Sequence, residues 1–155
     1  MNTSSKLSNL RAFWLAWLPV IAMFAFGQTA VFANPPVDPE IIVGDIEINE
    51  DGDVLDIFSD SDKSILFWES FNIGEGETTN FFLPGSEAAI LNKVTGGSGS
   101  SLLGSLNSNG KVFLINPNGI LIGQNATIDT GSFIASTLDL SNDNFLAGGD
   151  LIFQG

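Results

Sequence analysis

Short runs of β-branched and aromatic residues recur along the chain after residue 40, and turn-forming residues separate them. Gly, Asn, Ser and Asp fill the gaps, which is typical of strands joined by tight turns. No window in this part of the chain has the apolar stripe of an amphipathic helix. The sequence therefore predicts an all-β protein with strands at 41–43, 54–58, 65–68, 81–83, 89–91, 112–115, 120–122, 133–135 and 151–153.

Strands with frequent turns are compatible with a sandwich, a barrel or a β-solenoid. The spacing after Lys111 favours the solenoid, because turns at 116–119, 123–125 and 130–131 separate runs of about four to six residues. Asn is also plentiful at the turns, where its amides can stack into hydrogen-bonded ladders between successive coils. We therefore expect a solenoid, although the sequence has no fixed repeat period.

The first 33 residues have the three parts of a secretory signal peptide. Lys6 and Arg11 give a basic start, an uncharged apolar stretch covers 12–26, and small residues precede a cleavage site after Ala33. We predict that residues 1–33 are removed and that the general secretion machinery exports the rest.

A retained transmembrane anchor is the alternative for this segment. Pro19 and Gly27 interrupt the apolar stretch, which falls short of the roughly 20 residues that a span needs. The Pro-rich segment 34–40 cannot sustain a helix and is predicted to be an extended linker. Residues 41–155 are predicted to form one domain. We expect it to continue beyond this chain, because the apolar run at 151–153 lacks a polar cap.

The charge balance excludes several classes of function. After residue 33, three lysines (Lys63, Lys93 and Lys111) face eighteen carboxylates, a net charge of −15. Such a surface repels nucleic acids and anionic lipids. The chain also has neither Cys nor His. It therefore has no disulfide, no thiolate or histidine metal site, and no Ser-His-Asp triad.

The carboxylates concentrate in one segment, because 13 of the 18 lie between Asp38 and Glu77. A calcium loop starting at Asp60 would need Gly at position 65 and Glu at position 71, where the chain has Ile65 and Phe71. A solvated acidic surface that protects strand edges is the preferred interpretation, with no bound metal.

The candidates for a catalytic pair of carboxylates are Glu69, Glu75 and Glu77. Catalysis needs convergent titratable groups, and nothing in the sequence positions these three side chains together. The chain is therefore predicted not to be an enzyme and to need no cofactor.

The sharpest local motif is the turn from Asn116 to Ile120. Asn116 can accept a backbone hydrogen bond as an Asx-turn, and Pro117 fixes φ at the second turn position. Asn118 tolerates the third position, and Gly119 relieves crowding at the fourth. From the residues alone, the turn is either purely structural or part of a recognition site.

Together with its surroundings, this turn resembles the two-partner secretion domain, which is the amino-terminal domain of the filamentous haemagglutinin family. The similarity is strongest to the branch of high-molecular-weight adhesins. It covers nearly all of 65–155, whereas 41–64 matches loosely. The segments that carry it are 71–74, 89–96, 106–110, 112–120 and 135–140.

The resemblance implies a right-handed, single-stranded parallel β-helix of the pectin-lyase type with small capping strands. It also implies that a partner outer-membrane transporter with periplasmic recognition domains receives the exported chain. Asn116, Pro117, Asn118, Gly119 and Ile120 would correspond to the family's secretion motif. A second family motif, Asn-Pro-Asn-Leu, has no counterpart. The supporting motif residues would be Asn92, Val94, Thr95, Gly110, Ala135, Ser136 and Thr137.

The expected function is that of a secretion-targeting module of a large adhesin-like or haemolysin-like protein that passes through the periplasm to the cell surface. Edge strands would pair with the transporter, and the module would then nucleate folding of the β-helix outside. Contact with a host or neighbouring cell would reside in a further passenger region. Two alternatives remain open: a self-contained carbohydrate- or cell-binding surface protein, and a calcium-stabilised β-roll.

Overall fold

The computed structural model describes residues 35–155, in which the strands form four sheets: three in a solenoid and a small one near the carboxyl-terminal end. The predicted signal peptide and Asn34, the first linker residue, lie outside the described residues. The first half contains β1 (Glu40–Val43), β2 (Ile46–Asp51), β3 (Val54–Ser59), β4 (Lys63–Trp68), β5 (Thr78–Phe82), β6 (Ala89–Val94) and β7 (Ser100–Leu102). The second half contains β8 (Ser105–Ser108), β9 (Lys111–Ile115), β10 (Ile120–Ile122), β11 (Thr127–Asp129), β12 (Ser132–Ser136), β13 (Asp139–Leu140), α1 (Asn142–Ala147) and β14 (Phe153–Gln154).

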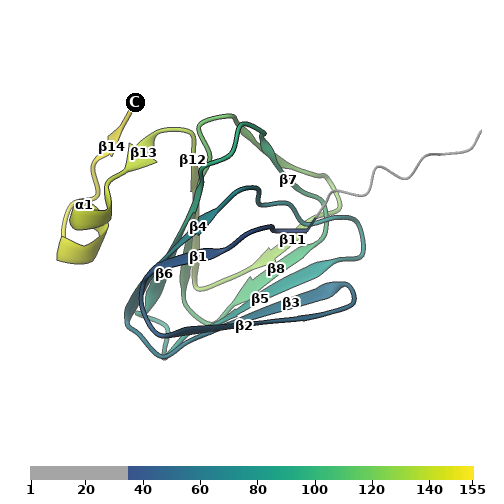
Figure 1. Ribbon diagram of the computed structural model, residues 1–155, viewed down its shortest axis with the longest axis horizontal. Helices are drawn as coiled ribbons and strands as arrows, with labels where there is room; N and C mark the ends of the chain where they lie inside the picture. Colours follow the sequence, from purple (N-terminus) through teal and green to yellow (C-terminus); the bar gives the residue numbers. More distant parts are fainter. Residues whose placement is uncertain (1–34) are drawn as a thin grey trace, which may run out of the picture. The chain divides into compact units, whose positions relative to one another are not determined.

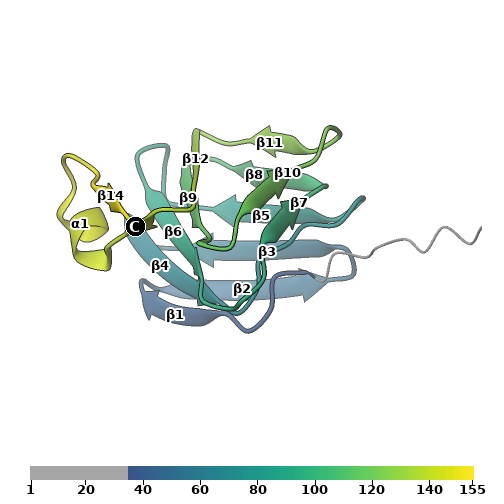
Figure 2. The ribbon, with the colours of Figure 1, turned by 90° about the horizontal axis from the view of Figure 1, so that it is seen from above.

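The three sheets form the sides of a solenoid. Sheet I has the strand order β1-β4-β6-β9-β12, sheet II has the order β11-β8-β5-β3-β2, and sheet III pairs β10 with β7. Figure 1 looks along the axis, so that the sheets outline a triangle, and Figure 2 shows successive coils stacked on one another. Each coil passes from sheet II to sheet I and then to sheet III, and equivalent strands pair in parallel. The solenoid has about four turns, which confirms the predicted parallel β-helix.

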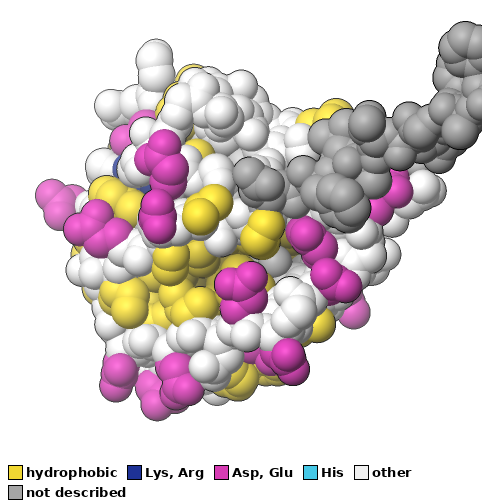
Figure 3. Space-filling model, turned by 45° about the vertical axis from the view of Figure 1, so that its right-hand side comes forward, with side chains coloured by type: hydrophobic (Ala, Val, Ile, Leu, Met, Phe, Trp, Pro, Cys, Tyr) yellow, Lys and Arg dark blue, Asp and Glu magenta, His cyan; other side chains and the backbone are white. Residues whose placement is uncertain are grey.

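Two antiparallel strands cover the amino-terminal end of the solenoid, as the resemblance implied. β1 pairs antiparallel with β4, and β2 pairs antiparallel with β3. Along the edge strand β2, Glu47, Glu50 and Asp51 are exposed. Carboxylates on an edge strand discourage pairing with other chains. Figure 3 shows one face of the molecule, on which acidic side chains surround hydrophobic ones.

The arrangement of apolar and polar residues along each strand depends on which faces of the strand are covered. Strands of sheet II bury only one face, so they alternate: Leu55 and Ile57 point inward, whereas Asp56 and Phe58 point outward. Strands of sheet I have apolar residues on both faces. Their inward residues join the main core, which includes Trp68. Their outward residues form a second core with the carboxyl-terminal segment: Ile65, Leu91, Phe113 and Ile115 pack with Leu140 and Phe145.

The carboxyl-terminal segment from Asp139 to Gln154, here called the flap, explains this second core. It consists of β13, α1 and β14, and it lies beside sheet I in Figure 1. The side chain of Ser141 accepts from the backbone N–H of Asn144 and caps α1. The sequence predicted no helix here. It also predicted a strand at 151–153, but only Phe153 of that run lies in β14.

All three lysines in the described part of the chain are on the outer side of sheet I, and each forms a hydrogen bond or an ion pair. Lys63 donates to the carbonyl oxygens of Phe145 and Leu146, and Lys93 pairs with Asp139. Lys111 donates to Glu87, and this hydrogen bond lowers the pKa of that exposed carboxyl. No helix among residues 35–155 is long and apolar enough to cross a membrane.

Candidate functional site

The turn between β9 and β10 has the geometry that its residues predict. The backbone N–H of Gly119 donates to the carbonyl oxygen of Asn116 at 3.1 Å, which closes a four-residue turn. The side-chain oxygen of Asn116 accepts from the N–H of Asn118 at 2.9 Å, which confirms the Asx-turn. Gly119 has φ of 110°, a conformation that favours glycine.

The side chain of Asn116 is fully buried and joins two coils. Its Nδ2 donates to the carbonyl oxygen of Ser98 at 3.0 Å and to Oγ of Ser100 at 2.9 Å. The side chain of Asn118 adds a third link, because its Nδ2 donates to the carbonyl oxygen of Gly96 at 2.8 Å. The turn of one coil is therefore hydrogen-bonded to residues 96–100 of the coil before it. Asn116 has no surface to offer a partner in the folded state, whereas Pro117 and Asn118 are exposed.

Several of the supporting residues lie at the same corner of the solenoid. Sheet I pairs Lys93 with Ile115 and Ile115 with Ser136, so 94–95, the turn at 116 and 136–137 follow one another along the axis. The N–H of Asn116 donates to the carbonyl oxygen of Ser136 at 3.0 Å. Thr95 reaches back to the first coil, where both its N–H and its hydroxyl donate to the carbonyl oxygen of Trp68. Val94 is buried at this corner, and Ala135 and Thr137 are exposed near it.

Two supporting residues lie elsewhere. Asn92 is buried inside the solenoid, where its oxygen accepts from Nε1 of Trp68 and its nitrogen donates to the carbonyl oxygen of Phe113. Gly110 is between β8 and β9, at a different corner. A Cβ at Gly110 would lie 2.7 Å from the carbonyl oxygen of Ala88, so the coils approach too closely there for a side chain. Both residues hold the fold together and have little or no surface for contact with a partner.

An apolar hollow lies beside the turn. It has a volume of about 390 Å³ and is lined by residues of the third and fourth coils. Leu138 in its wall is 46% exposed, and the neighbouring Leu121 is 59% exposed. Like Pro117 and Asn118, this hollow is accessible, in contrast to Asn116. It is lined by Ile120, Ile122, Ala135, Ser136, Thr137 and Leu138.

The carboxylates of the described region do not assemble a metal site. Among residues 35–155, no group of three or more Asp or Glu side chains is placed to hold a metal ion. Glu77 accepts from the N–H of Gly74, and Glu69 packs against Gly96. Glu77 therefore supports its own loop, whereas Glu69 contacts the loop of the next coil.

Sequence reasoning missed the outer face of sheet II. There, Phe58 and Phe82 stack with ring centroids 4.7 Å apart, and both are exposed. Beside them Asp56, Asn80 and Asn107 form a ladder of side-chain hydrogen bonds. Such ladders were expected at turns, but this one follows the strands. The alternation of Asp56 with Ile57 and of Asn80 with Phe81 was the available signal, because it places the polar residues on the solvent face.

Comparisons with known proteins identify the domain. The profile of the TPS secretion domain family matches residues 42–153. Two heme/hemopexin-binding proteins of Haemophilus influenzae are similar: one is 35% identical over 79% of this chain and the other 37% identical over 72%. The chain spans only 14% and 12% of their lengths.

A solved structure gives the same result. The crystal structure of the HMW1 secretion domain from Haemophilus influenzae superposes with a TM-score of 0.68 and 43% sequence identity. The match covers 71% of this chain and 29% of that one. The family is a secretion domain rather than an enzyme family, and its members are exported proteins. The family match and the similarity to the solved structure agree, so the chain belongs to the TPS secretion domain family.

Proposed function

We propose that this chain is the part of a larger exported protein that a partner outer-membrane transporter recognises. The proposal includes the leader at 1–33, the linker at 34–40 and the secretion domain at 41–155, with a route through the periplasm to the cell surface. Family membership supports the general role, because proteins with this domain are exported and engage such a transporter. We further propose that folding of the solenoid outside the cell starts from this domain.

The observation that supports the proposal is that the corner around Asn116 combines a buried link between coils with an accessible apolar hollow. The buried amide of Asn116 joins the third coil to the second, so it stabilises the stacking of coils that a growing solenoid requires. The apolar hollow beside it is accessible to a partner. We therefore assign coil stacking to Asn116 and Asn118, and contact with the transporter to Ile120 and Leu138.

The test compares secretion from cells that contain or lack the transporter. With the transporter, the wild-type chain should reach the medium; without it, the chain should stay in the periplasm. Asn116→Ala should reduce the secreted amount while the periplasmic amount stays detectable. Asn125→Ala is the matched control, because Asn125 is an exposed turn residue with no side-chain hydrogen bond to the described residues. Equal secretion with and without the transporter, or full secretion of Asn116→Ala, would contradict the proposal.

A second measurement separates the two roles at the corner. Asn116→Ala should slow refolding of the purified chain, because it removes two hydrogen bonds between coils. Leu138→Ser should leave refolding nearly unchanged, because Leu138 is half exposed, but should weaken binding to the transporter. If Leu138→Ser binds as tightly as the wild type, the hollow is not a contact surface.

A further inference from the structure

The hydrogen-bond ladder on sheet II ends with two acceptors side by side and no donor between them. Nδ2 of Asn80 donates to the Asp56 carboxylate at 2.8 Å, and Nδ2 of Asn107 donates to Oδ1 of Asn80 at 2.9 Å. A carboxylate only accepts hydrogen bonds at neutral pH, so Asp56 fixes the direction of both amides. Oδ1 of Asn107 is therefore left for the next rung. The register partner of Asn107 in that rung is Asp129, which is another acceptor.

This conflict cannot be resolved inside the ladder. Each amide has one donating and one accepting side, so two amides between two carboxylates leave one pair of acceptors face to face. No donor from residues 35–155 bonds to Oδ1 of Asn107 or to the Asp129 carboxylate. Asp129 is also exposed. These acceptors are therefore open to a donor from outside the fold.

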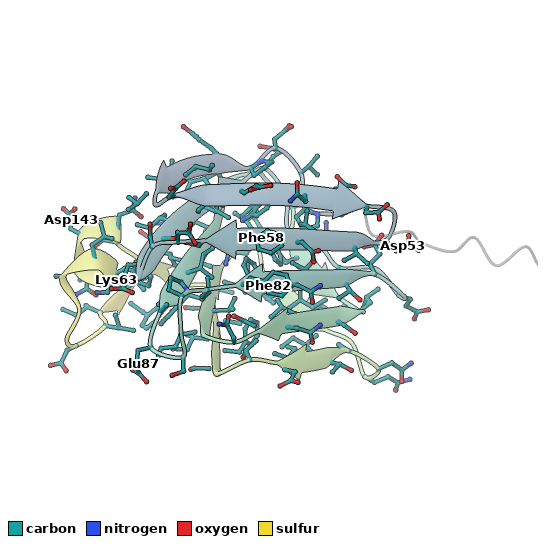
Figure 4. All side chains as sticks on the ribbon, turned by 90° about the horizontal axis from the view of Figure 1, so that it is seen from below. Asp53, Phe58, Lys63, Phe82, Glu87 and Asp143 are labelled. Atoms are coloured by element: carbon teal, nitrogen blue, oxygen red, sulfur yellow. The ribbon has the colours of Figure 1, made fainter. Side chains whose placement is uncertain are left out.

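An exposed aromatic side chain lines the same groove as this pair of acceptors. Phe82 lines the same groove as Asn107 and Asp129, and the groove has a volume of about 280 Å³. One face of the Phe82 ring stacks on Phe58 with the ring planes 13° apart. Figure 4 shows both rings on the outer side of adjacent strands. With 39% of Phe58 and 45% of Phe82 exposed, the pair presents an apolar surface to solvent.

The chemistry of the groove selects a guanidinium group. A guanidinium is planar, stacks on aromatic rings and presents five N–H donors, so it suits a groove that is lined by an exposed ring, an amide oxygen and a carboxylate. The charge also agrees, because eighteen carboxylates face three lysines after residue 33. All three lysines are bound on sheet I and cannot serve this groove.

We propose that the groove formed by Phe82, Asn107 and Asp129 binds an arginine side chain of the partner transporter's periplasmic region. This inference rests on the proposed function and adds a second contact surface, on sheet II, to the hollow beside the Asn116 turn. Binding there would engage side chains on the outer face of sheet II and leave the backbone edge of β2 free. The interaction weakens with increasing salt, because the groove and Asp129 are open to solvent.

The test uses Asp129→Asn, which has opposite effects on stability and on binding. The new amide can donate to Oδ1 of Asn107, so it completes the ladder and should raise the melting temperature. The same change removes the charge that attracts arginine, and should weaken binding to the purified periplasmic region of the transporter about tenfold. Asp143→Asn is the matched control, because it removes an exposed carboxylate of α1 (Figure 4) and should leave the Kd unchanged.

Phe82 provides an independent arm. Phe82→Leu keeps an apolar side chain but removes the ring, so it should weaken binding, and Phe82→Trp should restore it. On the transporter side, one Arg→Gln variant should reproduce the loss and add nothing to Asp129→Asn in a double-mutant cycle.

The outcomes separate this proposal from the general one. Transporter-dependent secretion of the wild type, with unchanged Kd for both Asp129→Asn and Phe82→Leu, would overturn the arginine site and leave the proposed function intact. Failure of the wild type to bind or need the transporter would overturn both. Binding of maltohexaose that Phe82→Leu abolishes, with an unchanged Kd for the transporter, would assign the groove to a sugar and also overturn the proposal.

Discussion

The ammonium group of Lys63 donates to the carbonyl oxygen of Phe145 at 2.8 Å and lies 5.7 Å from the centroid of the Phe145 ring. A second bond of 2.8 Å reaches the carbonyl oxygen of Leu146. Lys63 begins β4 in the first coil, so one side chain ties the start of the solenoid to the flap. A cation at the carboxyl-terminal end of a helix is also favoured by the helix dipole. The flap in turn covers the apolar outer face of sheet I.

Lys63→Met should therefore loosen the flap before it affects the coils. Methionine keeps the apolar stem but removes both charged hydrogen bonds, which should lower the free energy of unfolding by about 1–2 kcal/mol. Hydrogen exchange should become faster in α1 and β13, with β6 and β9 still protected. Lys111→Met is the control: solvent screens its pairing with the exposed Glu87, so this change should lower the stability much less than Lys63→Met. Equal effects of the two substitutions would show that Lys63 does not hold the flap.

Adjacent glycines give a matched pair for testing how closely the coils approach. A Cβ at Gly96 would collide with the backbone carbonyl oxygen of Glu69 in the coil below, whereas a Cβ at Gly97 would meet nothing within 4 Å. Gly96→Ala should cost about 1–3 kcal/mol, because backbone has to move, and Gly97→Ala should stay within about 0.5 kcal/mol of wild type. Urea denaturation of the two variants measures the difference. Similar midpoints would mean that the corner can relax around a methyl group.

The strands of sheet I were predictable because both of their faces are covered. The flap on one side and the core on the other make runs such as 65–68 and 112–115 continuously apolar. Five strands were missed, namely β2, β7, β8, β11 and β13; of these, β7, β8 and β11 each have one inward-facing large apolar residue among Ser, Asn, Thr or Asp. Their position is set by pairing with neighbouring coils, which local sequence does not reveal. The helix α1 is only six residues long, too short to show a helical period.

The candidate site was predictable as a turn but not as a buried link. Turn chemistry depends on residues 116–119 alone, so the sequence was sufficient for the Asx-turn. The burial of Asn116 follows from strand phase: Val112, Leu114 and Asn116 share the inward side. Its partners Ser98 and Ser100 come from another coil, and the varying coil lengths conceal which residues will stack. The unpaired acceptor at Asn107 was hidden for the same reason, because it depends on the register with Asp129.

The side chain of Asn109 bonds to both backbone groups of Leu83, as a neighbouring strand would. This contact is the subject of the third prediction. Its Oδ1 accepts from the N–H of Leu83 at 2.8 Å, and its Nδ2 donates to the carbonyl oxygen of Leu83 at 2.7 Å. Asn109→Ala leaves both backbone groups without these bonds and should destabilise the chain by about 1–2 kcal/mol. Asn109→Asp keeps the acceptor and should cost less. Amide exchange at Leu83, read by NMR, should accelerate in the Ala variant; unchanged exchange would show that solvent or another group replaces Asn109.

Asn92 gives the sharpest test of polar contacts inside the solenoid. It is fully buried, and its amide links Nε1 of Trp68 in the coil below to the carbonyl oxygen of Phe113 in the coil above. Asn92→Ala leaves a buried indole N–H and a buried carbonyl oxygen without this partner, and also opens a small cavity. We expect a loss of about 2–4 kcal/mol, because each unsatisfied buried group costs about 1–3 kcal/mol. Asn92→Leu fills the space but cannot bond to either group, so it should recover only the cavity part of the loss.

Trp68 reports the change directly. In a chain that begins at Asn34 it is the single tryptophan, because Trp14 and Trp17 precede that residue. Its fluorescence should follow urea unfolding with a lower midpoint for both Asn92 variants, and the indole N–H resonance should move as its hydrogen bond is lost. Asn107→Ala is the control: Asn107 is half-buried on the outer face of sheet II, so the indole resonance should not move. A midpoint for Asn92→Leu at or above that of the wild type would show that stacking of apolar side chains alone sets the stability of the coils. The buried amide would then contribute specificity of register rather than stability.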